Sequence, residues 1–132
     1  MIVLPPDALE FSDAWIDEVD GARWRSATGH GAAASGSSVI EVPAGCLLPR
    51  HTDSAEEAVV VLAGTASIKA GDEHAGVRAG GVAVVPKDVP HEVRNAGPDT
   101  LRFIAVYAEP EVVTTYEHPV QPDGSRERQT VE

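Results

Sequence analysis

Short apolar runs recur along the middle of the chain and are separated by turn residues. Between residues 36 and 116, these runs are four to seven residues long, rich in Val, and bounded by Gly, Pro and Asp. Runs of this kind are typical of β-strands, and no segment of this region has an apolar stripe at helical spacing. Many short strands at regular spacing predict an all-β sandwich or barrel with little helix. The clearest runs cover residues 38–42, 58–63, 66–70, 82–85 and 101–107.

The two ends of the chain differ from this middle region. Residues 1–35 contain both tryptophans, Trp15 and Trp24, followed by a stretch of small residues. We expect an N-terminal arm that packs on the barrel or on a partner chain, and then a mobile loop. Residues 117–132 contain two prolines, a glycine and six charged residues, which predicts an extended or frayed tail. The interpretation is a single domain over residues 1–132 with its barrel core at about residues 36–116.

The charge balance narrows the classes of partner. The 132 residues include 21 acidic and 10 basic ones, for a formal net charge of −11. Nucleic acids and anionic membrane surfaces bind clustered Lys and Arg, so we expect neither as a partner. No apolar run approaches the ~20 residues of a membrane span, and the first ten residues lack the layout of a signal peptide. The single cysteine, Cys46, cannot form an internal disulfide, and this fits a cytoplasmic location.

Four residues in the strand region carry the candidate chemistry. His51 and Asp53 are two positions apart, so they share one face of a strand. Glu57 and His91 each begin another predicted strand. If the barrel brings these strands together, two imidazoles and two carboxylates converge, and such a set suits a divalent transition metal. Carboxylates favour Mn or Fe, whereas imidazoles also suit Zn and Ni.

These residues lie in two segments that resemble the two short motifs of the cupin superfamily, which are small β-barrels that usually bind one metal ion. The matching positions are Gly45, His51, Glu57 and Gly64 in the first motif, and Gly80, Pro86, His91 and Asn95 in the second. Asp53 stands where the first motif has its second histidine, and Asp88 replaces the inner glycine of the second. The resemblance covers roughly residues 36–110. It implies an antiparallel cupin barrel of the jelly-roll or double-stranded β-helix type.

By this resemblance, the metal ligands are His51, Glu57 and His91, with Asp53 as a substituted fourth position. Asp53 either ligates the ion, orients an imidazole, or faces solvent. His51, Asp53 and His91 also form the two-histidine, one-carboxylate set of non-haem Fe(II) oxygenases. The alternative is a metal-free cupin in which these residues only hydrogen-bond within the barrel. The expected cofactor is one divalent transition metal, Fe, Mn, Zn or Ni, with Mn or Fe favoured.

The leading functional hypothesis is a small metal-dependent enzyme that acts on a compact organic substrate at this ion. The reaction is either oxygenation or isomerisation or cyclisation, with Asp53 or Glu57 as general base where it is not a ligand. The alternative is a non-catalytic module that binds a small ligand or a metal. Because small cupins usually pair, and because both tryptophans look exposed, we also expect a homodimer that exchanges its first strand.

Several other residues receive a structural interpretation. His30, His74 and His118 lie in Gly-rich, charged or Pro-flanked segments, which predicts loop positions. His30 has a second interpretation as a lid group over the barrel mouth. Tyr107 and Phe103 share a strand face and are both expected in the core, with the alternative that one of them lines a pocket. Cys46 is expected to be a small packed side chain.

Overall fold

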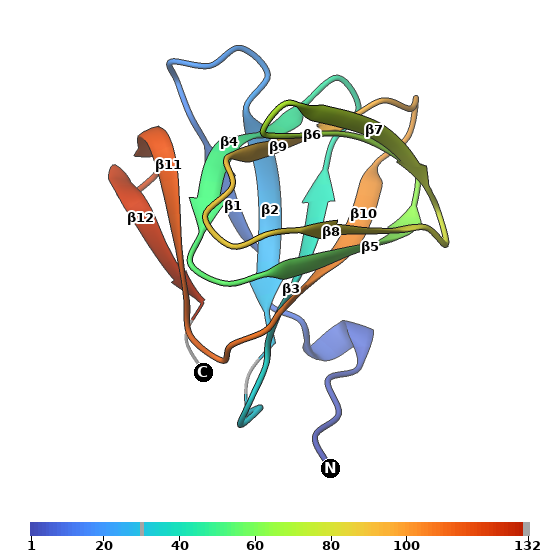
Figure 1. The fold of residues 1–132 in the computed structure, drawn as a ribbon, viewed down its shortest axis with the longest axis vertical. Coiled ribbons are helices and arrows are strands. Elements are labelled where there is room, and N and C mark those ends of the chain that lie inside the picture. The colour runs from blue at the N-terminus through green and yellow to red at the C-terminus, as the bar shows by residue number, and fades with distance from the viewer. Residues whose placement is uncertain (30, 131–132) are drawn as a thin grey trace.

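Two six-stranded antiparallel sheets packed face to face form the fold (Figure 1). The computed structural model describes residues 1–29 and 31–130. The predicted all-β barrel is confirmed, since the one helical element in this part of the chain is a single 3-10 turn, η1 (Pro6–Ala8). The strands are β1 (Ser12–Trp15), β2 (Arg23–Thr28), β3 (Gly36–Val42), β4 (Leu47–Asp53), β5 (Glu57–Ala63), β6 (Thr65–Ala70), β7 (Glu73–Arg78), β8 (Val82–Val85), β9 (His91–Asn95), β10 (Leu101–Tyr107), β11 (Val112–Val120) and β12 (Ser125–Thr130).

The sheet order places strands from distant parts of the chain side by side. One sheet runs β1-β2-β3-β10-β5-β8, and the other runs β12-β11-β4-β9-β6-β7. In this order β4, which follows β3 in the sequence, lies between β11 and β9 in the opposite sheet. The five predicted strands correspond to β3, β5, β6, β8 and β10. Each of them alternates buried and more exposed positions over at least part of its length, as a half-buried strand should.

Both ends of the chain are more ordered than the sequence suggests. The sheets extend beyond the predicted limits of 36–116, because β1 and β2 add two strands at one end and β12 adds one at the other. The C-terminal segment is therefore a paired strand through Thr130 and not a frayed tail. It escapes prediction because β12 is largely charged and polar, so its pairing depends on backbone hydrogen bonds with β11. His74 lies in β7 and His118 in β11, so neither is in a loop, while His30 lies outside the described residues.

The N-terminal tryptophans do not form an exposed pair. Trp24 is 4% exposed and belongs to the hydrophobic core. Its ring stacks on that of Tyr116 with centroids 5.3 Å apart. Trp15 is half-buried in β1. The expectation that both tryptophans are exposed is therefore wrong, because Trp24 is a core residue.

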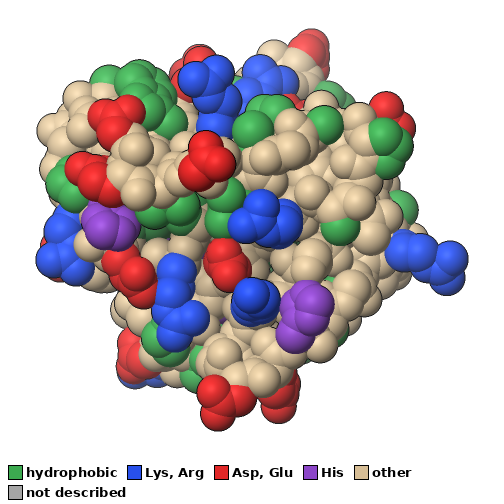
Figure 2. All heavy atoms as spheres, turned by 90° about the horizontal axis from the view of Figure 1, so that it is seen from above, with side chains coloured by type: hydrophobic (Ala, Val, Ile, Leu, Met, Phe, Trp, Pro, Cys, Tyr) green, Lys and Arg blue, Asp and Glu red, His purple; other side chains and the backbone are tan. Residues whose placement is uncertain are grey.

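The apolar core lies between the sheets. Its most deeply buried side chains come from strands of both sheets and are 0–1% exposed: Val42, Val59, Val61, Val93, Leu101 and Phe103. In the part of the chain that the structure describes, no helix has the length and apolar character needed to cross a membrane. Figure 2 views the molecule from the top of Figure 1, and acidic and basic side chains are interspersed on that face.

Candidate metal centre

The four candidate residues converge inside the barrel. His51 and Asp53 lie on the inner face of β4, Glu57 begins β5 and His91 begins β9. All four side chains are buried, with exposures of 1–4%. Each residue offers one ligand atom, and these atoms lie within 4.8 Å of one another. The predicted convergence of two imidazoles and two carboxylates is therefore what the fold produces.

Backbone carbonyl groups fix the orientation of both imidazoles. The Nδ1 of His51 lies 2.7 Å from the carbonyl oxygen of Pro49, and the Nδ1 of His91 lies 2.8 Å from that of Val89. Because a carbonyl oxygen only accepts, each Nδ1 carries the hydrogen and donates it. In the neutral ring the Nε2 lone pair then points into the cluster. Metal-binding histidines are usually held in this way.

The carboxylate of Asp53 is only half satisfied by the protein. Its Oδ1 accepts a hydrogen bond of 2.6 Å from the hydroxyl of Thr114. Its Oδ2 is buried and has no hydrogen-bond partner among the described residues, although it lies 3.1 Å from the Nε2 of His91 and 3.7 Å from that of His51. A buried carboxylate oxygen without a partner is unfavourable. A cation between these atoms would satisfy it.

Distances within the cluster fit one divalent ion. The Nε2 of His91 lies 3.0 Å from the Oε1 of Glu57, and one ring hydrogen cannot bind both that oxygen and Asp53. Around an ion with bonds of about 2.1 Å, adjacent ligand atoms are about 3 Å apart and opposite ones about 4.2 Å apart. The observed separations lie close to this range. The residues present therefore fit a divalent transition metal.

The two histidines of the metal-free cluster have opposite pKa shifts. Burial, with a further contribution from His91, lowers the pKa of His51 to about 4. Burial also opposes the charged form of His91, but its close contact with Asp53, its hydrogen bond to Glu57 and the negative charges of both outweigh it and raise its pKa to about 10. Without a metal, His91 is therefore the cation between the two carboxylates, and it must lose a proton before it can ligate an ion.

The two carboxylates also differ in their titration. Burial raises the pKa of Glu57, and the negative charge of Asp53 adds to this shift. Burial acts in the same direction on Asp53, but the close contact with His91, the nearby His51 and the hydrogen bond from Thr114 lower its pKa overall. Asp53 is thus the carboxylate that stays ionised most readily. Glu57 is the one better able to take up a proton.

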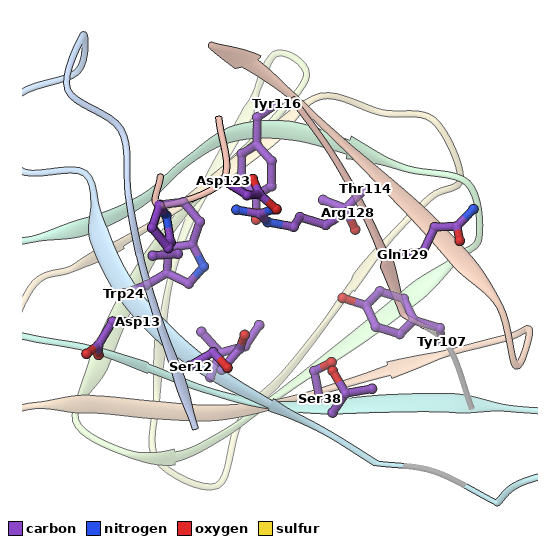
Figure 3. A pocket seen from close by; sticks show the side chains of 15 residues that line it. Ser12, Asp13, Trp24, Ser38, Tyr107, Thr114, Tyr116, Asp123, Arg128 and Gln129 are labelled. Carbon is purple, nitrogen blue, oxygen red and sulfur yellow. The ribbon is translucent and has the colours of Figure 1, made fainter. Parts of the chain in front are cut away.

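A cavity of about 350 Å³ (Figure 3) is lined by strand neighbours of the cluster residues, but by none of the four cluster residues themselves. Thr114, Tyr116 and Tyr107 line it together with Trp24 and Arg128. Of the two lining candidates from the sequence, Tyr107 lines this cavity and Phe103 is fully buried in the core, while the other lining residues were not predicted. The alternation of Thr114 and Tyr116 on one strand face was an available signal, but which strand they pair with cannot be read from the sequence.

The motif residues outside the cluster shape the turns around it. Asn95 donates to the carbonyl oxygens of Val42 and Asp99 and accepts from the amide of Gly97, so it ties together the turn between β9 and β10. Asp88 has φ = 62°, in the left-handed region that favours glycine. Its backbone amide donates to the carbonyl oxygen of Asp53, which links the turn before His91 to β4.

The sequence and the fold both have relatives among known proteins. The family model described as "Cupin domain" matches residues 38–107, just over half of the chain. The chain belongs to the cupin family. No curated protein matches this sequence.

Solved structures resemble this cupin in fold. The Cnp3 cupin domain of Schizosaccharomyces pombe is 19% identical with a TM-score of 0.61, covering 65% of this chain and 64% of that one. Lactobacillus farciminis oxalate decarboxylase is 19% identical with a TM-score of 0.67, covering 79% of this chain and 32% of that one. Bacillus subtilis oxalate decarboxylase, described with Mn(II) centres, is 20% identical with a TM-score of 0.61, covering 72% and 28%. This cupin thus spans about a third or less of the decarboxylases.

Proposed function

We propose that this cupin is a metal-dependent enzyme that acts on a compact organic substrate bound beside the ion. The observation that carries the proposal is the buried cluster of His51, Asp53, Glu57 and His91. Its strand neighbours Thr114, Tyr116 and Tyr107 line a cavity large enough for a small molecule. The unpartnered Oδ2 of Asp53 supports the presence of a cation. A purely structural polar cluster would be expected to satisfy that atom within the protein.

The chain's own residues have separable roles in this proposal. His51, Glu57 and His91 hold the ion, and Asp53 either completes the set or orients it. The ion would supply Lewis-acid activation of a substrate oxygen, or redox chemistry with dioxygen if it is iron or manganese. Where Glu57 does not ligate, its raised pKa suits it to accept a proton from the substrate. Oxygenation and isomerisation or cyclisation are both compatible with these roles.

Manganese or iron is the proposed metal. Two carboxylates and two imidazoles form a harder, more negative ligand set than three imidazoles and one carboxylate. Two ionised carboxylates would also neutralise a divalent ion completely, which weakens it as a Lewis acid. The manganese of the bacterial oxalate decarboxylase makes Mn(II) a natural first choice for reconstitution.

The second candidate is a non-catalytic module that binds a small ligand or a metal. It is favoured by the departure from the cupin motif at Asp53. Both candidates require the same metal site. They differ in whether a bound compound is changed.

Turnover measurements on reconstituted protein distinguish these candidates. Protein loaded separately with Mn(II), Fe(II), Zn(II) and Ni(II) is incubated with a panel of enolisable compounds while dissolved dioxygen is recorded. Dioxygen uptake with product supports oxygenation, and product without uptake supports isomerisation or cyclisation. Ligand binding without any product supports the binding module. Failure to bind any of the four metals would overturn both candidates.

We also propose that the protein is a homodimer, now on the evidence of an exposed apolar sheet face. The outer side of β8, β5 and β10 carries Val82, Val84, Leu62 and Val106, which are 40–61% exposed. These strands lie next to one another at the end of their sheet. The chain as a whole has a net charge of −11, but these four side chains are uncharged. A second copy can therefore approach this face without strong repulsion. Light scattering should give the dimer mass, and Val84→Glu should give the monomer; a wild-type monomer at micromolar concentration would contradict this.

A further inference from the structure

A second layer of polar side chains lies directly beside the candidate metal ligands. In the sheet register, Thr114 is paired with Asp53, and Tyr116 with His51. In the opposite sheet, Tyr107 is paired with Glu57. Cross-strand partners lie on the same face of a sheet. Three of the four candidate ligands therefore have a hydroxyl-bearing neighbour inside the barrel.

The two phenol groups of this layer have unused hydrogen-bonding capacity. Tyr107 and Tyr116 are each 5% exposed and line the cavity. Neither hydroxyl has a hydrogen-bond partner among the described residues, whereas the hydroxyl of Thr114 donates to Asp53. Figure 3 shows the oxygen of Tyr107 directed toward the space that the labelled side chains surround. Neither hydroxyl is among the buried atoms without a partner, so both reach the open cavity and are free to donate to a ligand there.

Both phenols remain protonated over the whole physiological range. A phenol has an ordinary pKa of about 10 and therefore carries its hydrogen at neutral pH. A neutral phenol offers a hydrogen to an acceptor oxygen. The best acceptors in a small molecule are carboxylate, enolate and carbonyl oxygens.

Arg128 brings a positive charge to the same cavity. It is paired across the strands with Thr114, so it shares the inner face of β11 and β12. Its side chain is 31% exposed, and it is the only Lys or Arg that lines this cavity within residues 1–29 and 31–130. Figure 3 shows its side chain among those that surround the cavity. Arg128 also pairs with Asp123 and donates to the carbonyl oxygen of Val120 at 3.2 Å.

The acidic groups at the cavity mouth oppose an anionic ligand only weakly. Asp13 and Asp123 line the mouth, but both are exposed, and the Asp123 side chain is 59% exposed. Water screens charges in such positions. In the interior, two carboxylates and a divalent cation would sum to zero. Arg128 then decides the sign of the charge that a ligand meets.

We propose that the cavity recognises the carboxylate of a small organic acid, with Tyr107, Tyr116 and Arg128 as its hydrogen-bond donors. This inference rests on the proposed function, because it names the substrate class of that site. Tyr107 and Tyr116 determine specificity by donating to acceptor oxygens. Arg128 supplies a charge-assisted contact at the mouth. A cavity of about 350 Å³ has the volume of roughly a dozen water molecules, which limits the ligand to a compact acid.

Binding of acids and their matching amides tests this recognition. Isothermal titration compares glycolate with glycolamide, pyruvate with pyruvamide, and benzoate with benzamide, on Mn(II)-loaded and on metal-free protein. Each pair has nearly the same shape and differs in charge. We expect at least one acid to bind about tenfold or more tightly than its amide. If no acid binds more tightly than its amide, the proposal is wrong even when the metal binds normally.

Substitutions separate recognition from a structural role of the hairpin between β11 and β12. Arg128→Met should remove most of the preference for the acid, whereas Arg128→Lys should retain part of it. Asp123→Asn removes the carboxylate that competes for Arg128 and should strengthen acid binding. Arg128→Met and Asp123→Asn lose the same ion pair of the hairpin, so a purely structural effect would act in the same direction in both. Tyr107→Phe, which keeps the ring, should weaken acid binding about tenfold. Arg78→Gln, on exposed β7, is the control and should change nothing.

The metal-free titrations distinguish this proposal from the proposed function. If no metal binds but Arg128→Met still removes the preference for the acid, the recognition is correct and the metal-dependent function is wrong. If the metal binds and Arg128→Met and Asp123→Asn shift acid binding in the same direction, the arginine acts structurally. That last result would overturn the proposal.

Discussion

The two halves of the barrel interior are built from the same strands but differ in chemistry. Along β10, the inward side chains change from Leu101 and Phe103 to Tyr107, and along β5 they change from Val61 to Glu57. One half is a dry, closely packed core whose largest side chains are 0–1% exposed. The other half contains the buried cluster and the cavity.

This contrast assigns stability to one half of the interior and chemistry to the other. Apolar burial stabilises the fold wherever it occurs. Burial of two carboxylates and two imidazoles without a metal leaves the Oδ2 of Asp53 without a partner and shifts the pKa values of both histidines. The polar half therefore costs stability in the metal-free protein. A bound cation would restore that lost stability.

The largest expected effect on stability comes from a substitution in the apolar half of the interior. Phe103→Ala leaves a cavity among fully buried neighbours and should lower the free energy of unfolding by about 3–5 kcal/mol, measured in denaturant. The protein that remains folded should still bind one metal per chain, since Phe103 does not belong to the cluster. Thr114→Val is the matched variant for the other half: loss of its hydrogen bond to Asp53 should cost only about 1–3 kcal/mol of stability while weakening metal binding. If both variants weakened metal binding equally, the assignment of stability to one half and of metal binding to the other would be wrong.

Asp53 carries the next largest effect. Asp53→Ala should weaken binding of Mn(II) or Fe(II) by roughly ten- to a hundredfold, whether the carboxylate ligates the ion or orients a ligand. Asp53→His should keep the fold and the metal site but shift the metal preference and alter any activity. Isothermal titration of both variants tests this. Unchanged affinity in Asp53→Ala would place the aspartate outside the site.

Metal affinity should also rise with pH. The folded metal-free protein carries a proton on His91, whose pKa is raised to about 10, and an ion must displace that proton. Below this pKa the dissociation constant should fall about tenfold for each unit of pH, as titrations between pH 6 and pH 8 would show.

The raised pKa of His91 also makes the stability of the metal-free protein depend on pH. The stabilisation that charged His91 provides is fully present below its ordinary pKa of 6.5 and is lost as the pH rises through about 10. Thermal melting of metal-free protein should record that loss. A melting temperature that does not fall as the pH approaches 10, or a metal affinity that does not vary with pH, would show that His91 is neutral in the metal-free protein.

Local backbone strain beside the site gives the smallest effect. Asp88 adopts φ = 62° where the cupin motif has glycine, so Asp88→Gly should raise stability by up to about 1 kcal/mol. Gly64→Ala is the opposite control, because Gly64 has φ = 83° and an added Cβ would lie 3.1 Å from the Cα of Leu101. It should destabilise the protein. A destabilised Asp88→Gly would show that the aspartate side chain itself supports the turn.

The sequence predicts the metal cluster better than it predicts the cavity. Spacing within β4 puts His51 and Asp53 on one face, and the two motifs supply Glu57 and His91. Thr114 lies 61 positions from Asp53, and its contact depends on β11 pairing with β4. That register follows from the whole fold, and local patterns do not contain it.

Only strands with a buried apolar face can be predicted from the sequence pattern. The runs rich in Val were recognised because one face of each is buried. β12 has no such apolar face, and β4 is interrupted by Pro49 and Arg50. Arg128, which lies on β12, was therefore missed together with its strand.

Elemental analysis of the purified protein tests the central claim most directly. Wild-type protein prepared without chelator, or reconstituted with Mn(II) or Fe(II), should contain about one divalent metal per chain. His91→Ala removes one ligand and should lose most of that metal, because the affinity should fall by about a hundredfold or more. His74→Ala, on exposed β7, should retain it. Near-zero metal in the wild type after reconstitution, or full metal content in His91→Ala, would contradict the account.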